Sequence, residues 1–346
     1  MTIQEQIQLA EYTTFKIGGP ARFFCQVSDE DGLVEAVMFA HDKNLRVFIL
    51  GGGSNILISD KGFDGLVIKM EIGGIKYEAG NTIVSVGAGE QWDTLVEQTV
   101  ERGLYGLENL SAIPGTVGAA PVQNIGAYGS EASKVITNVR AFDTKTMKFV
   151  ELSNADCNFS YRDSLFKKEK GRYIITRVDF SLSKNGKVDI GYKDLADYFA
   201  NLMRVGLNKN KNITDPSLQE VREAVINVRW GKLPDWKLWG TAGSFFKNPV
   251  VSADKFAELK NKYPELLGFP ESDGRVKVSL GWVLDNVCHV KGMQKGHVQV
   301  YEKQALVLVT KPGAMSEEVV SLAHELMDMV KEKTGIEIEG EVEWVN

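Results

Sequence analysis

The spacing of apolar side chains along the chain separates helical from extended segments. Residues 28–31 resemble a capping box and open a helical pattern, with apolar side chains at positions 33, 34, 37 and 38. Residues 92–100 repeat this spacing and predict a second helix. Residues 135–152 predict a hairpin that turns at residues 143–146. Other apolar or alternating runs predict strands at residues 45–50, 56–58, 66–68, 82–86 and 173–182, the last of them half-buried.

Two segments in the middle of the chain are less regular. Residues 104–130 are rich in small and apolar side chains but show no clean period, so they predict irregular backbone rather than a linker. Residues 184–213 are polar and predict a mobile excursion, with a Lys/Asn-rich run at 208–212. A helix is predicted to start at residues 214–216, because proline is tolerated in the first turn.

The C-terminal third predicts a new domain. After residues 232–235 the strand and helix signals alternate again. A helix is predicted to begin at Ser316 and to end at Gly335, followed by a last strand over residues 336–345. On one strand, alternate residues share a face, so four glutamates are expected on the same side: Glu337, Glu339, Glu341 and Glu343. The pattern does not select one of them for a functional role.

Composition narrows the class of protein. The chain has 346 residues and a net charge of −6, which disfavours a general nucleic-acid binder. No apolar run approaches the roughly 18–20 residues of a membrane span, and the N-terminus lacks the features of a secretory signal. Three widely spaced cysteines and four unpaired histidines favour neither a disulfide framework nor a metal site. We therefore expect a protein of the reducing cytoplasm.

Glycine is enriched and clustered, with 34 residues in the chain. The first cluster, Gly51, Gly52, Gly53, Ser54 and Asn55, follows a predicted strand. It lacks the Gly-Lys-Ser/Thr of a Walker A loop and the spacing of the Rossmann fingerprint. Two interpretations stay open: a nest whose N–H groups bind an anion, and a tight β-turn.

A second glycine-rich segment covers residues 113–129. Small side chains let its backbone lie against a flat or extended ligand, while Gln123, Asn124 and Tyr128 supply directional hydrogen bonds. The alternative is a buried crossing of small residues between two layers. Two such segments in one chain favour a cofactor of dinucleotide size.

Two side chains outside these segments carry candidate chemistry. Arg162 can stabilise an anion or enolate in a cleft, although a surface ion pair with Asp163 is the favoured alternative without further context. Ser244 does not stand in the Gly-x-Ser-x-Gly pattern of a hydrolase. It can give a proton to a neighbouring carbanion, or it can be a core serine bonded to backbone.

Lysines offer a third kind of candidate. Lys232, Lys247 and Lys291 can serve a phosphorylated substrate. Each of them alone is more typical of a surface lysine. The lysines therefore add weight only in combination with other motifs.

The order of these motifs resembles the UDP-N-acetylenolpyruvoylglucosamine reductase family, from Tyr12 almost to the C-terminus. The matching segments are residues 50–55, 87–90, 106–110, 113–115, 123–129, 161–164, 243–249 and 304–307. Several of these segments are weak alone, but their joint order and spacing are specific. Residues 191–195 are similar to the longer subtype of the family, which carries a tyrosine loop over the substrate.

The resemblance implies an α+β fold. It consists of an FAD-binding domain of the vanillyl-alcohol-oxidase type, made of two α+β subdomains, and a C-terminal α+β substrate-binding domain. The first subdomain would cover residues 1–70 and be joined by the last strand at 336–346. The second would cover 71–230, with the tyrosine-loop excursion at 184–213, and the substrate domain would cover 231–335.

The resemblance also implies a reaction in two steps. NADPH first reduces FAD; the flavin then gives hydride to C3 of the enolpyruvyl ether of UDP-N-acetylglucosamine, and a proton is added at C2. The family's acid falls on Ser244, and its enolate-stabilising pair falls on Arg162 and Glu341. A preorganised cation suits the charge that develops beside the substrate carboxylate. Many family members have a basic residue where this chain has Glu343.

Two sets of ligand-binding positions follow from the motifs and the resemblance. The FAD positions are Gly51, Gly52, Gly53, Ser54, Asn55, Gly115, Thr116, Gly118, Gln123, Asn124, Gly126, Ala127 and Tyr128. The nucleotide-sugar positions are Tyr192, Lys232, Asn248, Lys291 and Gln304. We expect a monomer that binds FAD, NADPH and UDP-N-acetylenolpyruvoylglucosamine, and no metal, nucleic acid or membrane.

Three rival classes are weaker. A flavin oxidase on the same cofactor domain is disfavoured because no histidine in either glycine-rich segment can tether FAD covalently. A non-enzymatic nucleotide-sugar binder is disfavoured because Arg162, Ser244 and Glu341 occur together. A serine hydrolase lacks the sharp turn that its nucleophile needs.

Overall fold

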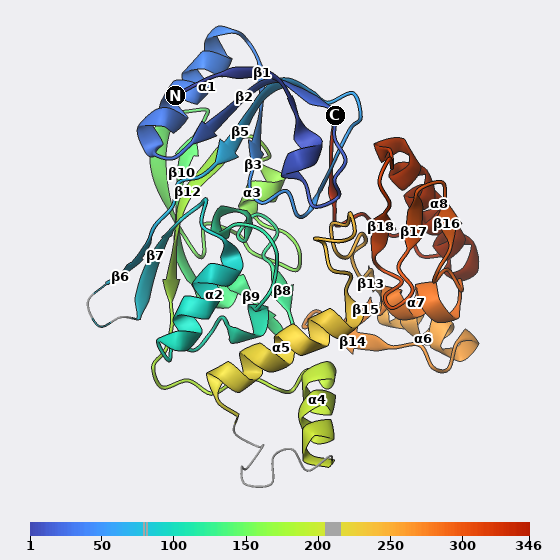
Figure 1. The fold of residues 1–346 in the computed structure, drawn as a ribbon. Helices are drawn as coiled ribbons and strands as arrows, with labels where there is room; N and C mark the ends of the chain where they lie inside the picture. Colours follow the sequence, from blue (N-terminus) through green and yellow to red (C-terminus); the bar gives the residue numbers. More distant parts are fainter. Residues whose placement is uncertain (79, 81, 205–215) are drawn as a thin grey trace. The chain divides into compact units, whose positions relative to one another are not determined.

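The computed structural model describes residues 1–78, 80, 82–204 and 216–346, which form two compact units. Unit 1 contains residues 1–7, 21–52 and 64–231, and unit 2 contains residues 8–20, 53–63 and 232–346. Each unit combines helices with mainly antiparallel sheets (Figure 1). This arrangement confirms the predicted α+β class.

The first sheet of unit 1 has the strand order β1-β2-β5-β3. Its strands are β1 (Gln4–Gln8), β2 (Pro20–Val27), β5 (Phe63–Met70) and β3 (Arg46–Leu50). Strands β3 and β5 are parallel. Helix α1 (Glu30–Asp42) connects β2 to β3 and starts as predicted, because the Asp29 carboxylate accepts the N–H of Gly32 at 2.7 Å.

The second sheet of unit 1 is antiparallel, with the order β11-β10-β12-β7-β6. Its strands are β6 (Ile75–Tyr77), β7 (Ile83–Gly87), β10 (Ile136–Asp143), β11 (Lys148–Ser153) and β12 (Tyr173–Ser181). The predicted hairpin is confirmed as β10 and β11. The half-buried character predicted for β12 is wrong, because it lies between β10 and β7 and consecutive residues, Ile174, Ile175 and Thr176, are buried.

Unit 1 has one large apolar core between its sheets and helices. Helix α2 (Trp92–Glu101) buries Trp92, Leu95, Val96 and Val100 in this core, as predicted. The segment 104–130 is irregular, also as predicted. Its short elements are η2 (Glu108–Leu110), η3 (Val117–Ala119), β8 (Gly126–Ala127) and the start of β9 (Ser130–Glu131). Two more short helices follow it, η4 (Ala132–Lys134) and α3 (Leu165–Lys168).

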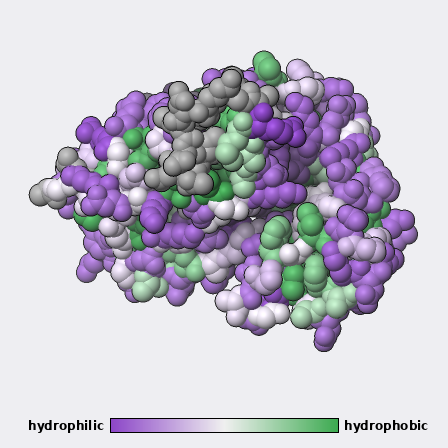
Figure 2. Space-filling model, turned by 90° about the horizontal axis from the view of Figure 1, so that it is seen from below, coloured by the Kyte–Doolittle hydropathy of each residue, from purple (hydrophilic) through white to green (hydrophobic). Residues whose placement is uncertain are grey.

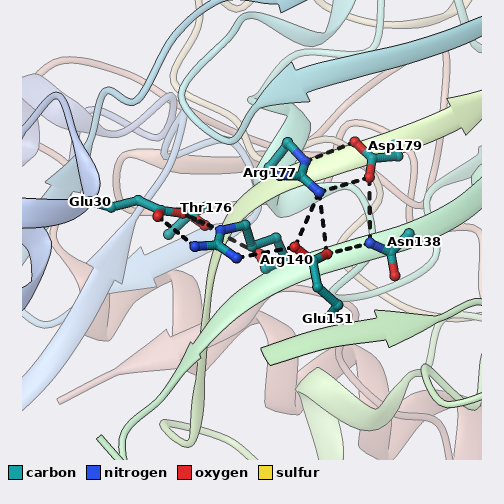
Figure 3. A network of polar contacts seen from close by, with 7 residues as sticks. All are labelled: Glu30, Asn138, Arg140, Glu151, Thr176, Arg177 and Asp179. Atoms are coloured by element: carbon teal, nitrogen blue, oxygen red, sulfur yellow. Dashed lines mark hydrogen bonds and ion pairs between the residues drawn. The ribbon is translucent and has the colours of Figure 1, made fainter. Parts of the chain in front are cut away.

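A network of charged side chains fastens α1 to the second sheet (Figure 3). Arg140 on β10 donates two hydrogen bonds to Glu30, at 2.7 and 2.9 Å, and its other nitrogen lies 3.1 Å from Glu151 on β11. Arg177 on β12 contacts Glu151 at 3.2 Å and Asp179 at 2.9 Å. The network therefore joins one helix to three strands of unit 1.

The polar stretch of unit 1 contains a helix that the sequence analysis did not predict, α4 (Lys193–Arg204). It packs beside α5 (Leu218–Lys232), with Leu195 and Phe199 buried against Val221 and Val225 (Figure 1). The excursion predicted for this stretch thus contains a helix with a buried face, and its mobility stays a prediction. These apolar side chains recur at helical spacing, but the many polar neighbours obscured the signal.

Helix α5 begins at Leu218, after the predicted start at residues 214–216. Ser217 caps it, because the Ser217 Oγ accepts the Glu220 N–H at 3.3 Å and the Glu220 carboxylate accepts the Ser217 N–H at 2.8 Å. The prediction for residues 205–213, including the Lys/Asn-rich run, and for 214 and 215 lies outside the described residues.

Unit 2 has a separate apolar core and three small sheets, β13-β15-β14, β16-β17-β18 and β19-β4. Its strands are β4 (Ile56–Ile58), β13 (Val250–Val251), β14 (Gly268–Pro270), β15 (Val276–Val278), β16 (Gln294–Lys295), β17 (Val298–Val300), β18 (Leu308–Thr310) and β19 (Glu343–Val345). Its helices are η1 (Leu9–Tyr12), α6 (Ala253–Lys262), α7 (Leu280–Asn286) and α8 (Ser316–Thr334).

The C-terminal elements confirm one prediction and correct another. Helix α8 has the predicted limits and ends where Gly335 adopts a φ of +70°, a conformation that glycine adopts without strain. The last strand is shorter than predicted, because only residues 343–345 pair with β4. The four glutamates therefore do not share one strand face: Glu337 and Glu339 are exposed, whereas Glu341 and Glu343 are partly buried.

On the face shown in Figure 2 most residues are hydrophilic and the hydrophobic ones form separate patches. The cysteines, Cys25, Cys157 and Cys288, are buried as free thiols. Across the part of the chain that the structure describes, no helix is both long and apolar enough to cross a membrane.

Candidate functional site

The two glycine-rich segments meet inside unit 1. A Cβ atom on Gly52 would lie 2.6 Å from the Cα of Gly115, and one on Gly51 would lie 2.7 Å from Oγ1 of Thr116. Gly115 has a φ of +124°, which residues with a side chain rarely adopt. The two backbones thus approach each other where no side chain fits. Such a cradle suits a cofactor held through main-chain groups.

A third segment braces this cradle. The N–H of Gly118 bonds to the carbonyl of Ala88 at 2.9 Å, and the N–H of Val117 bonds to the carbonyl of Glu90 at 2.9 Å. A Cβ atom on Gly118 would lie 2.5 Å from the Cβ of Ala88. Gly118 is therefore required by packing. Its neighbours Thr116, Val117 and Ala120 are buried, so the predicted buried crossing describes this part of the segment.

The first glycine cluster is divided between the two units, after Gly52. In unit 2, Gly53 has a φ of +64° and its carbonyl accepts the N–H of Thr14 at 3.0 Å. The side-chain nitrogen of Asn55 donates to the carbonyl of Glu341 at 3.1 Å. The Asn55 carbonyl accepts the N–H of Glu343 at 3.0 Å. Part of the cluster is thus fixed to the C-terminal segment of unit 2.

Asn124 is buried, and its side chain braces the second segment from within. Its amide nitrogen donates to Glu131 Oε2 at 2.9 Å and to the Ser160 carbonyl at 3.1 Å, while its oxygen accepts the Ser133 N–H at 3.0 Å. The residue has a φ of +45°. Any contact of Asn124 with a cofactor would therefore use its backbone. Sequence reasoning missed Glu131, whose role depends on this contact.

Arg162 is held against the same segment. Its guanidinium donates to the carbonyl of Gly126 at 2.6 Å and lies 3.5 Å from the carbonyl of Asn124. Its own φ is +54°, a strained conformation of the kind that often occurs at functional sites. Asp163 forms its ion pair with Lys168, at 3.1 Å, rather than with Arg162. The alternative of a surface pair between Arg162 and Asp163 is therefore wrong.

Two tyrosines come together next to this segment. The rings of Tyr128 and Tyr192 meet edge to face with their centroids 5.5 Å apart. Burial raises the pKa of Tyr128 to about 12, although Arg229 on α5 hydrogen-bonds to it and acts in the opposite direction. The Tyr128 hydroxyl therefore stays protonated at neutral pH. Tyr192 is 42% exposed, so part of its ring is open to a ligand.

Unit 2 places Ser244 and Glu341 on neighbouring backbone. The N–H of Phe245 bonds to the carbonyl of Leu306 at 2.8 Å, and the carbonyl of Phe245 accepts the N–H of Glu341 at 2.7 Å. Ser244 is only partly buried. Among the residues that the structure describes, none forms a hydrogen bond with its hydroxyl. The alternative of a core serine bonded to backbone is therefore wrong.

The predicted sugar-binding residues of unit 2 fall into two groups. Gln304 accepts the N–H of Leu306 at 3.3 Å, and Asn248 accepts the N–H of Leu280, the first residue of α7, at 3.0 Å. Both lie on the loops that flank the Ser244 segment. Lys291 forms an ion pair of 2.5 Å with Asp285 on α7, and Lys232 is exposed at the end of α5. The ion pair with Asp285 does not join Lys291 to the Ser244 segment.

Two family models match the chain. Residues 21–153 match an FAD binding domain, and residues 235–345 match the C-terminal domain of UDP-N-acetylenolpyruvoylglucosamine reductase. The first match includes the glycine cradle, and the second includes Ser244 and Glu341. The likeness thus covers the segments that the geometry singles out in both units.

Curated relatives match over nearly the whole chain. UDP-N-acetylenolpyruvoylglucosamine reductase from Neisseria gonorrhoeae is 45% identical over 99% of this chain and 97% of its own length. The proteins of that name from Ralstonia nicotianae and Pseudomonas aeruginosa are 42% and 38% identical, covering 96% and 99% of this chain and 96% and 98% of their own lengths. A crystal structure of the Thermus caldophilus protein matches 100% of both chains with a TM-score of 0.70 at 23% identity, which supports the fold.

Proposed function

The chain belongs to the UDP-N-acetylenolpyruvoylglucosamine reductase family, and from this membership we propose that it reduces UDP-N-acetylenolpyruvoylglucosamine to UDP-N-acetylmuramate with NADPH. The family and the matched FAD binding domain make the chain an FAD-dependent oxidoreductase of peptidoglycan precursor synthesis. The electron donor, the route of hydride and proton, and the residue roles are the parts that we propose. The observation that carries the proposal is the 45% identity to a relative over 99% of the chain.

FAD, when bound, supplies a carrier that takes hydride from NADPH and delivers it to the enolpyruvyl double bond. We assign its binding to the glycine cradle, where the backbone of Gly52 lies against that of Gly115 and Gly51 lies against the side chain of Thr116. Gly53, Ser54 and Asn55 continue the same cluster. Gln123, Gly126, Ala127 and Tyr128 would line the second segment. Glycine backbone that is not covered by side chains of its own suits a group held through main-chain donors.

Arg162 would stabilise the negative charge that develops on the substrate when hydride reaches C3. Its guanidinium is fixed by the carbonyls of Gly126 and Asn124, so it would need no reorganisation during the reaction. A cation fixed in this way lowers the barrier more than a mobile surface arginine. The strained φ of Arg162 agrees with a residue held for such a task.

Ser244 would supply the proton. Its O–H bond breaks as the C2–H bond of the product forms, and its oxygen then regains a proton from water. A half-buried hydroxyl that has no hydrogen-bond partner within the described part of the chain is available for this step. Glu341 would bind the substrate carboxylate beside it. Its backbone adjoins Phe245, whereas Glu339 is exposed and pairs with Lys247 at 3.2 Å, which favours Glu341 for the role.

The remaining predictions are part of the same proposal. Tyr192, Lys232, Asn248, Lys291 and Gln304 would bind the UDP-sugar. The division into residues 1–70 with 336–346, 71–230 and 231–335 would separate two FAD-binding subdomains from a substrate domain. A monomer in the cytoplasm completes the proposal.

An anaerobic absorbance experiment tests the proposed function. NADPH should bleach the flavin band of the purified holoenzyme, and the enolpyruvyl sugar should then restore it. Bleaching without recovery would refute the substrate. The absence of a flavin band after addition of FAD would refute the assignment of the cradle.

The role of Ser244 has its own test in the same experiment. Ser244→Ala should slow the recovery of the band by about a hundredfold or more, the usual loss for an acid catalyst, and leave bleaching by NADPH unchanged. Ser321→Ala, an exposed position on α8, serves as the control and should behave as the wild type. Equal recovery rates in the Ser244 variant and the control would refute the assignment.

A further inference from the structure

Asn109 ties together the two segments of unit 1 that carry Tyr128 and Tyr192. It lies on η2 and is 3% exposed. Its side-chain nitrogen donates to the carbonyl of Tyr128 at 2.9 Å and to the carbonyl of Asp189 at 2.8 Å. Both partners are carbonyl oxygens, so only the NH2 end of the amide can face them, and both of its protons are used.

The backbone around Asn109 is firmly held. The indole N–H of Trp92 donates to the carbonyl of Leu110 at 2.9 Å, and the Asp93 carboxylate accepts the N–H of Ala112 at 2.6 Å. Arg222 on α5 donates two further hydrogen bonds to the same Asp93 carboxylate, at 2.6 and 3.0 Å. Because α2 and α5 fix this stretch, the amide of Asn109 acts from a rigid support.

The segment that Asn109 holds has no regular secondary structure. Residues 184–191 form neither helix nor strand, so no ladder of main-chain hydrogen bonds fixes them. Asp189 Oδ1 accepts the N–H of Gly191 at 2.9 Å, which is a local turn, and Val188 and Ile190 pack against neighbouring apolar clusters. The bond from Asn109 to the Asp189 carbonyl ties this segment to a distant part of the chain. It does so three residues before Tyr192.

The other end of the same amide is unused. The Asn109 Oδ1 atom is buried and has no hydrogen-bond partner among the described residues. A buried oxygen of this kind lowers stability, so an apolar side chain of similar size would fill the space better. The amide is thus a poor space-filling choice and a good choice only as a double donor.

We propose that Asn109 is a positioning residue for the UDP-sugar: by holding the Asp189 carbonyl beside the Tyr128 carbonyl, it fixes the Tyr192 ring against the Tyr128 ring. This inference rests on the proposed function, because it takes Tyr192 as a contact of the nucleotide-sugar. Without the tie, Tyr192 samples many positions, and the sugar binds only the fraction of molecules in which the ring is correctly placed. Asn109 itself touches neither FAD nor the reacting atoms.

Two substitutions test the tie in the FAD-loaded enzyme. Asn109→Leu removes both donors, and Asn109→Asp keeps the shape but replaces the donor with an acceptor. Each should raise KM for the sugar about tenfold, the loss expected for one positioning hydrogen bond to a fixed group. The kcat at saturating sugar should change less than about twofold, because the chemistry is untouched. An unchanged KM in both variants would overturn the proposal.

Asn227→Leu is the matched control. Asn227 is exposed on α5 and donates to the hydroxyl of Tyr198 on α4 at 3.0 Å, so it also joins two elements of the same region through one amide. Among the described residues, no hydrogen bond joins Asn227 to residues 189–192. Its substitution should leave KM and kcat within about twofold of the wild type. An equal rise of KM in this control would show a general loosening of α4 and would overturn the specific role of Asn109.

A double-mutant cycle asks whether Asn109 acts through Tyr192. If it does, Asn109→Leu should raise KM in the wild type but should cause no further rise in Tyr192→Ala. Additive effects would overturn the proposed route. Hydrogen exchange gives a readout that needs no substrate: amides of residues 186–196 should exchange faster in Asn109→Leu, and unchanged protection would overturn the tie.

The outcomes also separate this inference from the function on which it rests. A wild type that binds FAD but never reduces the sugar would refute the proposed function together with the role of Asn109. A wild type that turns over normally, with an unchanged KM in Asn109→Leu, would refute only the role of Asn109. Thermal melting of each variant in the presence of FAD confirms that a raised KM comes from folded protein.

Discussion

The predicted site residues of the two units are held in place by different means. In unit 1 the backbone around the cradle is irregular, and side chains such as Asn109, Asn124 and Asp93 supply hydrogen bonds that a sheet would otherwise supply. In unit 2 Ser244 and Glu341 are fixed mainly by main-chain bonds between neighbouring segments and by the apolar core beneath them.

This difference predicts where the protein tolerates change. Main-chain hydrogen bonds form whatever the side chain is, so unit 2 should accept most polar substitutions away from Ser244 and Glu341. Side-chain bracing depends on one residue type at each position, so unit 1 should lose ligand binding or stability when a bracing residue changes. Four substitutions, taken from the largest expected effect to the smallest, test this contrast.

The largest effect is expected from Gly52→Ala. The new Cβ atom would lie 2.6 Å from the Cα of Gly115, and the backbone of the cradle would have to move apart. Overpacking against main chain costs about 1–3 kcal/mol, so we expect bound FAD to fall more than about tenfold. Flavin content per protein measures it. Gly231→Ala, which meets nothing within 4 Å, is the control, and normal flavin in Gly52→Ala would refute the cradle as the cofactor site.

The next effect is expected from Arg222→Leu. The Arg222 side chain is 6% exposed and bonds to Asp93. Asp93 in turn accepts the N–H of Ala112, three residues after Asn109. Leaving Asp93 without this partner should lower the free energy of unfolding by about 2 kcal/mol, less than for a fully buried pair because Asp93 is 39% exposed. Urea unfolding followed by circular dichroism measures the loss. Arg275→Leu in unit 2 is the comparison, because the ion pair of Arg275 with Asp273 is exposed. An equally small loss of stability in Arg222→Leu would contradict the view that unit 1 depends on side-chain bracing.

A smaller, pH-dependent effect is expected from Glu30→Gln in the network of Figure 3. Hydrogen bonding from Arg140 lowers the pKa of Glu30 below its ordinary value, although partial burial opposes the shift. A carboxylate with a lowered pKa stabilises the fold above its unfolded pKa, and that contribution disappears as the pH falls through the folded pKa. We expect a loss of about 1 kcal/mol at pH 7 that shrinks towards zero at acidic pH. Urea unfolding at several pH values measures it, and a pH-independent difference would contradict the assignment.

The smallest effect is expected from Lys331→Ala on α8 of unit 2. Lys331 pairs with Glu337 at 2.7 Å, but both side chains are largely exposed and the pair does not touch the Ser244 segment. Solvent screens such a pair, so the free energy of unfolding should not differ measurably from that of the wild type. Thermal melting at low and high salt measures this change. A loss comparable to that of Arg222→Leu would show that unit 2 also depends on side-chain bracing.

Local signals explain the elements that the sequence predicted correctly. Helices α1 and α8 have caps within a few residues, Asp29 at one start and Gly335 at one end, and α2 has an unbroken apolar face. Helix α4 was missed because only a few apolar residues mark its buried face, and their partners on α5 are distant in sequence. The burial of β12 depends on its place between β10 and β7, which no local pattern encodes.

The site divides in the same way. The sequence identified both glycine-rich segments, Arg162, Ser244 and the group of glutamates, because glycine clusters and isolated polar residues are visible without a fold. It left the choice between Arg162 as a functional cation and as a surface ion pair open. The ion pair of Asp163 with Lys168 excludes the surface pair, and the role of Arg162 as a functional cation stays a prediction. The sequence did not indicate Asn109 or Glu131, because the role of an asparagine or a glutamate depends on the groups that it contacts in the folded chain.

The sequence by itself thus determined the family, the α+β class and the segments where backbone must replace side chains. Only the tertiary structure decided that Gly52 lies against Gly115, that Asn109 joins Tyr128 to Asp189, and that the backbone of Glu341 lies beside Phe245. The physical reason is the range of the interactions. Caps, turns and periodic faces act between residues a few positions apart, whereas these contacts join segments that folding brings together from distant parts of the chain.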